Sequence, residues 1–125
     1  MKLLLFVATG GAIGAISRFL LSGYFQKFSS NDFPIGTLGV NIIGSFFIGM
    51  AIIYFEDIAK PEYKALFVTG ILGALTTFST FSYETTMLLE NANYIKALAN
   101  IILNVVLTIT ATILGILFIK KFIGV

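Results

Sequence analysis

Four long apolar stretches, separated by short polar segments, dominate the sequence. They cover residues 3 to about 25, 33–55, 65 to about 89, and 97–119. An α-helix rises about 1.5 Å per residue, so about 20 residues cross the hydrocarbon core of a bilayer. Each stretch reaches that length, and the second and the fourth contain no charged residue. The pattern therefore predicts an all-α integral membrane protein with four transmembrane helices.

The connecting segments are short and carry most of the charged residues. They are residues 26–32, 56–64 and 90–96, and the middle one contains Pro61, which a helix interior does not tolerate. None of them resembles a linker between domains. We therefore expect residues 1–125 to form a single domain. An even number of spans places both termini on the same side of the membrane.

Composition agrees with this class and narrows the chemistry. Hydrophobic residues make up 58% of the chain and charged residues 11%, unlike an ordinary soluble domain. Cysteine and histidine are both absent from the sequence, which removes thiol chemistry, disulfides, the commonest metal ligand and the commonest general base. We therefore expect no enzymatic activity. The eight basic residues form no polybasic run, so nucleic acid is not an expected partner.

The lysines orient the protein only weakly. The side with the termini and the middle connection has five lysines, and the other side has two, with Arg18 towards that end. They are Lys2, Lys60, Lys64, Lys120 and Lys121 on the first side, and Lys27 and Lys96 on the second. The positive-inside rule then favours cytoplasmic termini by a small margin. Insertion in both directions is an open alternative.

The first two stretches each contain one unusual polar residue. Arg18 lies inside the first stretch, where an arginine either snorkels to the interface or lines a wet vestibule that attracts anions. Asn41 is the strongly polar residue of the second stretch, and its amide can donate to an anion or to another helix. Beside Arg18, Gly10 and Gly14 have the small-xxx-small spacing that predicts close helix packing.

The third stretch is a poor candidate for an uninterrupted helix. Gly70 and Gly73 precede five hydroxyl residues within residues 76–82. This composition predicts a helix broken at mid-membrane, where backbone can line a polar cavity and freed carbonyls can hold a small cation. The alternative is that the hydroxyls bond back to their own helix. Phe78 and Phe81 lie three apart on one face, and their ring edges suit either an anion path or ordinary packing.

The fourth stretch carries a polar stripe. Asn100, Asn104, Thr108 and Thr112 recur every four residues, which places them on one face of a helix. Four polar residues in register indicate the wall of a wet path. A polar seam between two copies of the chain is the competing interpretation.

Taken together, three segments resemble the signature of the Fluc-type (CrcB) fluoride channels. They are GAISRF at residues 14–19, GTLGVN at 36–41 followed by GSF at 44–46, and GALTTFSTF at 73–81. The resemblance extends over the whole chain, and the TTFSTF run is its most specific part. It implies a passive channel that exports fluoride across the inner membrane of a prokaryote. It also implies an antiparallel, dual-topology homodimer with two pores and a structural sodium ion (Na+) at its centre.

The resemblance also implies roles for individual residues. Phe78 and Phe81 would be the pore phenylalanines and Asn41 the pore asparagine, and the carbonyls of Gly73 and Thr76 would bind the sodium ion. The resemblance also implies that Ser79 and Thr80 lie along the fluoride path, with Arg18 near the vestibule. From the polar stripe of the fourth stretch, we expect Asn104 and Thr108 to line the same path.

Some positions depart from the family pattern, and one rival class remains. Phe19 stands where tyrosine often follows the arginine, and Asn100 and Asn104 stand where other members carry tyrosine and serine. A dual-topology small multidrug-type exporter, coupled to protons, would have a similar length and helix count. Such a carrier is expected to have a carboxylate in its first helix, and this first stretch has none.

Overall fold

The computed structural model describes residues 1–58 and 60–125, and their regular structure is entirely helical. The elements are α1 (Lys2–Gln26), α2 (Ile35–Ile58), α3 (Pro61–Lys64), η1 (Ala65–Leu72), α4 (Gly73–Leu75), α5 (Phe78–Glu90) and α6 (Tyr94–Ile123). Four helices are long and apolar enough to cross a membrane, judged by length and composition. They are Lys2–Gln26, Ile35–Glu56, Pro61–Glu90 and Tyr94–Ile123. The predicted all-α fold with four long apolar helices is confirmed.

The third helix is a composite of four segments. It begins at Pro61, whose missing N–H costs nothing in the first helical turn. After the short α3, the chain winds as the π-helical segment η1 and returns to α-geometry in α4. Thr76 and Thr77 are then extended, with φ/ψ of −83°/154° and −150°/116°, before α5 begins at Phe78. We call these two extended residues the helix break.

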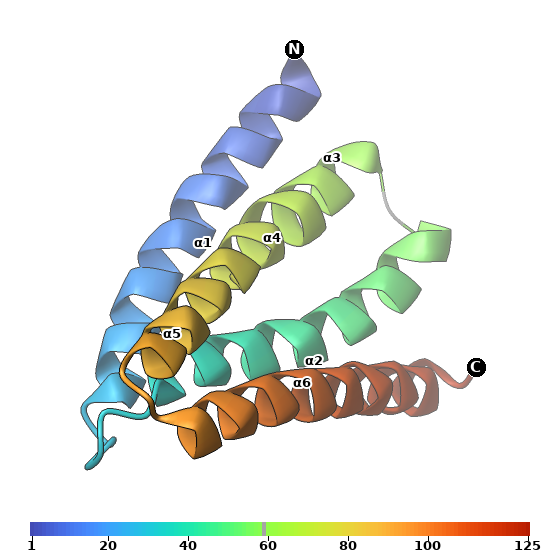
Figure 1. Ribbon diagram of the computed structural model, residues 1–125. Helices are drawn as coiled ribbons and strands as arrows, with labels where there is room; N and C mark the ends of the chain where they lie inside the picture. The colour runs from blue at the N-terminus through green and yellow to red at the C-terminus, as the bar shows by residue number, and fades with distance from the viewer. Residues whose placement is uncertain (59) are drawn as a thin grey trace.

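The helices associate as two diverging pairs (Figure 1). One pair is α2 with α6, and the other is α1 with η1 and α4. The pairs meet near the connections at residues 27–34 and 91–93, where α1 also packs on α2 and α5 packs on α6. They separate towards the end that carries both termini and the connection between α2 and α3.

Close backbone contact between α1 and η1 depends on glycine. A Cβ atom at Gly10 would collide with the carbonyl oxygen of Leu66, and one at Gly14 would collide with that of Ile71. Gly70, on η1, lies against the backbone of Gly10 in return. We call this contact the glycine crossing. It agrees with the packing role that the spacing of Gly10 and Gly14 predicted, because small residues let two backbones approach in a membrane.

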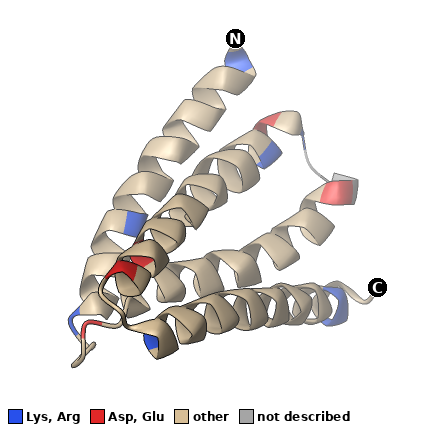
Figure 2. Cartoon of the chain, viewed as in Figure 1, with Lys and Arg blue, Asp and Glu red and all other residues tan. Residues whose placement is uncertain are grey.

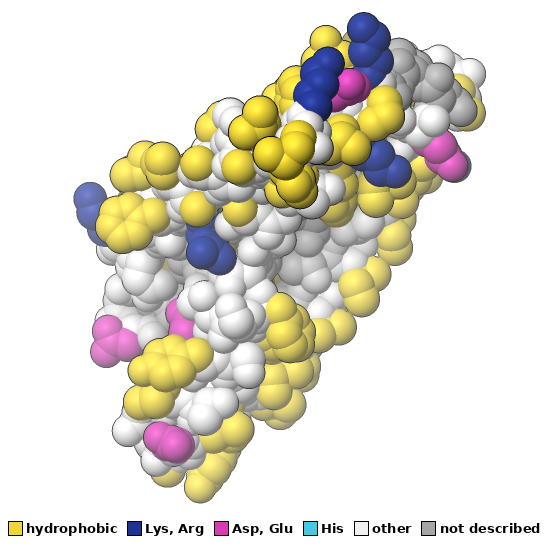
Figure 3. All heavy atoms as spheres, turned by 90° about the horizontal axis from the view of Figure 1, so that it is seen from above, with side chains coloured by type: hydrophobic (Ala, Val, Ile, Leu, Met, Phe, Trp, Pro, Cys, Tyr) yellow, Lys and Arg dark blue, Asp and Glu magenta, His cyan; other side chains and the backbone are white. Residues whose placement is uncertain are grey.

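The surface of the single chain is largely apolar. Long side chains such as Ile16, Leu20 and Ile102 are exposed along the helices, and apolar atoms cover much of the face seen in Figure 3. Charged residues lie mainly towards the helix ends (Figure 2). The largest side chains buried to below 2% exposure are Val40 and Asn100. An amide among the most buried groups of an apolar bundle needs hydrogen-bond partners, which the next section describes.

Candidate functional site

The helix break is held by the side chain of Asn41. The N–H of Thr77 donates to Asn41 Oδ1 at 2.8 Å, and Asn41 Nδ2 donates to the carbonyl of Thr77 at 3.1 Å. A primary amide offers one donor edge and one acceptor edge, so it can replace both helical partners of a single unwound residue. Thr77 is buried, and leaving its backbone groups unpaired would be costly. Asn41 therefore has a structural role that the sequence left as an alternative.

The start of α5 is capped within the same segment. The Thr77 hydroxyl accepts from the N–H of Thr80 at 3.2 Å, and it contacts the hydroxyls of Ser79 and Thr80 at 3.2 and 3.0 Å. Threonine is a favoured N-cap residue because its side chain satisfies a free N–H of the first turn. The adjacent Thr76 behaves differently, since its hydroxyl donates back to the carbonyl of Leu72 at 3.2 Å.

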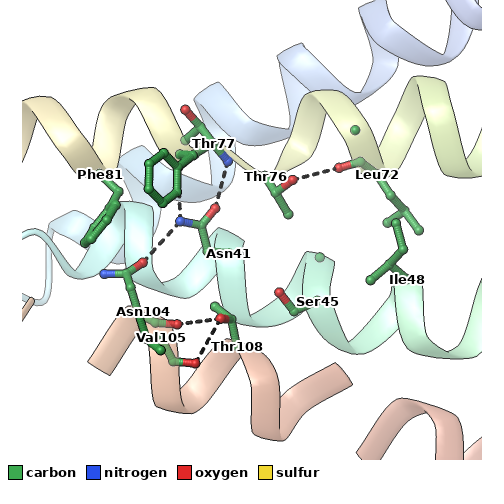
Figure 4. Close-up of a pocket in the computed structure, with 13 residues that line it drawn as sticks. Asn41, Ser45, Ile48, Leu72, Thr76, Thr77, Phe81, Asn104, Val105 and Thr108 are labelled. Atoms are coloured by element: carbon green, nitrogen blue, oxygen red, sulfur yellow. Dashed lines mark hydrogen bonds between the residues drawn. The ribbon is translucent and has the colours of Figure 1, made fainter. Parts of the chain in front are cut away.

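A cavity of about 280 Å³ opens beside the helix break (Figure 4). Its walls come from α2, the third helix and α6 and combine amides, hydroxyls and two phenyl rings. They are formed by Asn41, Gly44, Ser45, Ile48, Leu72, Gly73, Thr76, Thr77, Phe78, Phe81, Asn104, Val105 and Thr108. The structure thus brings together seven of the residues that were predicted for the pore or the sodium site: Asn41, Gly73, Thr76, Phe78, Phe81, Asn104 and Thr108.

The two phenylalanines contact each other but differ in exposure. Their ring centroids are 5.2 Å apart and the rings are tilted by 59°. Phe81 is 8% exposed, whereas Phe78 is 77% exposed in the single chain. Phe78 therefore lines the cavity at its open side, whereas Phe81 lies inside the bundle.

A second cavity, of about 290 Å³, also has Thr77 in its wall. It is lined by Ala15, Arg18, Phe19, Ser22, Thr37, Val40, Thr77 and Thr80. Arg18 and Thr80 therefore belong to this cavity and not to the first. Ser79 lines neither cavity within the part of the chain that the structure describes. Thr77 borders both, which makes it the residue between the two spaces.

The polar stripe of α6 connects to two other helices of the same chain. Asn41 Nδ2 donates to Asn104 Oδ1 at 3.2 Å, and Asn104 Nδ2 donates to the carbonyl and Oδ1 of Asn100 at 2.9 and 3.0 Å. Asn100 Nδ2 donates to the hydroxyl of Thr85 on α5 at 2.9 Å. We call these four side chains the amide chain. Further along α6, Thr112 donates to the carbonyl of Ser45 at 3.1 Å.

Two backbone carbonyls at the helix break lose their usual partners. In a continuous helix, the carbonyl of Gly73 would accept from the N–H of Thr77, and that of Thr76 would accept from the N–H of Thr80. Both N–H groups donate elsewhere, to Asn41 and to the Thr77 hydroxyl. The oxygens of Gly73 and Thr76 are therefore suited to a hard cation, which prefers oxygen ligands. Side-chain clusters of three or more acidic, histidine or cysteine residues do not occur among the described residues.

Sequence reasoning missed Thr85, and it did not assign individual roles to Thr77 or to Asn100, which it expected only as part of the polar stripe. Thr77 caps α5 and borders both cavities, and Thr85 and Asn100 bury the far end of the amide chain. Thr85 follows Phe81 by one helical turn, and this spacing is the signal that could have identified it. Glu84, the acidic residue of this span, has one carboxylate oxygen buried with no hydrogen-bond partner in the described structure.

A bundle of four apolar helices around an amide-lined cavity defines a class of multi-pass membrane protein. The chain belongs to the CrcB family, because residues 5–116 match the family described as "CrcB-like protein, Camphor Resistance (CrcB)". Curated relatives are similar along nearly their whole length. The chain is 52% identical over 122 residues to a protein of Sulfurovum sp. named "Fluoride-specific ion channel FluC", covering 98% of this chain and 97% of that one.

Two further relatives carry the same name. A protein of Nitratiruptor sp. is 52% identical over 118 residues, which is 94% of this chain and 92% of the relative. One of Campylobacter lari is 48% identical over 118 residues, which is 94% of this chain and 97% of the relative. The family that the sequence motifs indicated is therefore confirmed.

Proposed function

We propose that this protein is a fluoride channel of the bacterial inner membrane that lets fluoride leave the cell passively. The observation that carries the proposal is the identity of about half of all residues with fluoride-specific channels over nearly the full chain. It is a multi-pass membrane protein of an ion-channel family, and not an enzyme. The rival class, a proton-coupled multidrug exporter, finds no support in the family assignment.

The chemistry of the first cavity suits a small, strongly hydrated anion. Such an ion must exchange water for donors that bind it, yet not so strongly that it cannot leave. The cavity offers the amide of Asn41, the hydroxyl of Ser45 and the phenyl rings of Phe78 and Phe81, whereas the hydroxyl of Thr108 donates to the carbonyl of Asn104. Lysine and arginine are absent from its described walls, so no positively charged side chain would trap the ion there. Arg18, in the second cavity, would attract anions from the aqueous side.

Two further parts of the proposal concern assembly. The high exposure of Phe78 supports a second copy that covers the ring and completes each pore. The weak lysine bias allows that copy to insert in the opposite direction, giving an antiparallel, dual-topology homodimer. The helix break then lies at mid-membrane, and the diverted carbonyls of Gly73 and Thr76 from both copies hold a structural sodium ion (Na+) on the twofold axis.

Efflux from liposomes tests the function. Vesicles that contain only this protein and are loaded with potassium fluoride should release fluoride when valinomycin balances the charge, without a proton gradient. Matched vesicles loaded with potassium chloride should retain their ion. Comparable chloride release, or fluoride release only under a proton gradient, would refute a passive selective channel.

Cysteine labelling tests the topology. The chain has no natural cysteine, so a single cysteine at Lys27 or at Lys121 can be labelled selectively from outside intact cells. Dual topology predicts that about half of the molecules react at each position. Complete labelling at one position and none at the other would contradict it.

A further inference from the structure

The amide chain has only one consistent orientation. At one end the N–H of Thr77 can only donate, so it requires the oxygen of Asn41, and the carbonyl of Thr77 requires the nitrogen. Asn41 therefore turns its remaining N–H towards α6, where Asn104 must present its oxygen. Asn104 must then turn its nitrogen to Asn100. These assignments follow from backbone groups whose donor and acceptor roles are fixed, and not from the choice of amide flip.

The opposite end fixes the same orientation. The hydroxyl of Thr85 donates to the carbonyl of Phe81 at 2.8 Å, so its oxygen is left to accept from Asn100 Nδ2 at 2.9 Å. Asn100 must therefore turn its own oxygen towards Asn104. Thr85 and Asn100 are 7% and 1% exposed, so a partner lost by either residue would leave a buried polar group unpaired.

We propose that Asn100 and Thr85 are positioning residues for the anion path. The proposal rests on the proposed function of the cavity. Both residues lie outside the described cavity wall. Thr85 accepts from Asn100, and Asn100 accepts from Asn104. The oxygen of Asn104 then accepts from the second N–H of Asn41 at the cavity wall. This oxygen satisfies the donor while no ion is present, and an entering anion replaces it. If the side-chain amide of Asn104 were turned over, its NH₂ group would face the NH₂ group of Asn41. Two donors cannot pair, so Asn41 would be displaced from the helix break.

Paired substitutions at one position separate positioning from packing. Thr85→Val keeps the shape of the side chain but removes the acceptor for Asn100, whereas Thr85→Ser keeps the hydroxyl and removes the methyl group. A positioning role predicts fluoride efflux about tenfold slower in Thr85→Val and close to wild type in Thr85→Ser. A packing role predicts the reverse order. Thr86→Val is the matched control, because the Thr86 hydroxyl bonds only to the carbonyl of Ser82 at 2.9 Å and is exposed.

A spectroscopic measurement tests the hydrogen bonds of the amide chain without measuring transport. In detergent-solubilised protein labelled with ¹⁵N-asparagine, Thr85→Val should shift the side-chain NH₂ signals of Asn104 and Asn41, and Thr86→Val should leave both in place. If the wild-type protein passes no fluoride, the proposed function fails, and these signals still decide whether the amide chain transmits the change.

Two outcomes would overturn the inference. In the first, Thr85→Val passes fluoride at the wild-type rate and its Asn41 signals do not shift. In the second, efflux is slower in Thr85→Ser than in Thr85→Val. If Thr85→Val does not elute as folded protein, Thr85→Cys replaces it, because sulfur is a weaker acceptor of similar size. Thr85→Cys should then be slower than Thr85→Ser, and equal rates would overturn the proposal.

Discussion

The glycine crossing and the amide chain join helices by opposite means. At the glycine crossing, α1 and η1 meet through backbone atoms and the absence of side chains at Gly10, Gly14 and Gly70. Along the amide chain, α2, α5 and α6 meet through side chains whose donors and acceptors are paired in series. The first contact is fixed by shape and tolerates no added atom. The second is fixed by polarity, and it borders the cavity that we assign to the ion.

The difference shows where each kind of contact is useful. Lipid tails are as apolar as leucine, so a membrane protein gains little by hiding apolar surface and relies on close packing and hydrogen bonds. Shape alone suffices where the helices only need to stay together. Where a pore needs donors at defined positions, paired amides provide both the contact and the donors. The two regions should therefore respond differently to substitution.

The largest effect is expected at the point where the amide chain meets the helix break. Asn41→Leu removes the donor at the cavity and leaves the N–H and carbonyl of Thr77 unpaired. We expect fluoride efflux to fall about a hundredfold, equivalent to about 2.7 kcal/mol, and the melting temperature to fall as well. Liposome efflux and thermal unfolding in detergent measure the two effects.

Asn91→Leu is the control for that substitution, because Asn91 is exposed and bonds only to the carbonyl of Met87 at 2.9 Å. It should retain wild-type efflux. Wild-type efflux in Asn41→Leu would show that this amide serves neither the pore nor the helix break.

An intermediate effect is expected at the glycine crossing, and it should appear in stability. In Gly14→Ala, the new methyl group would collide with the carbonyl of Ile71 and lie 2.9 Å from the Cβ of Ala74. We expect a loss of about 1–3 kcal/mol from overpacking. Gly11→Ala is the matched control, since a Cβ at Gly11 meets nothing within 4 Å.

Gly11→Ala should leave the protein as stable as the wild type or slightly more stable, because alanine favours helix by about 1 kcal/mol over glycine. Thermal unfolding of the two variants under identical conditions makes the comparison. Equal melting temperatures would contradict a crossing that depends on shape.

The smallest effect is expected at the ends of the helices, outside both regions. Lys2 Nζ lies 3.5 Å from Glu62 Oε1, and the side chains of Lys2 and Glu62 are 74% and 24% exposed. Because water screens the lysine of this pair, Lys2→Gln should change stability by less than about 1 kcal/mol. A loss as large as that of Gly14→Ala would show that charge at the helix ends contributes to the fold as much as helix packing does.

The sequence predicted the helices and the glycine crossing better than it predicted the hydrogen-bond partners within the site. The length of each apolar stretch can be read from a short window of sequence, and so can the spacing of Gly10 and Gly14. The roles of neighbouring threonines are not local. Thr76 bonds back to its own helix, as the alternative interpretation stated, whereas Thr77 caps the next one.

Asn41 shows the same limit. Its sequence context allowed a donor to an anion or a contact between helices, and the structure shows the contact. Which partner each side of an amide selects depends on residues 36 and 63 positions away, at Thr77 and Asn104. No pattern within a single helix contains that information.

The long separation between Asn41 and Asn104 also sets an order of completion during protein synthesis. The glycine crossing needs only α1 and η1, so it can form once residue 72 has left the ribosome and entered the bilayer. The cavity wall lacks Asn104 and Thr108 until the last helix is inserted. A growing chain therefore holds its first three helices together before any ion path is finished. A chain that ends before residue 104 would therefore lack part of the wall of the cavity that we assign to the ion.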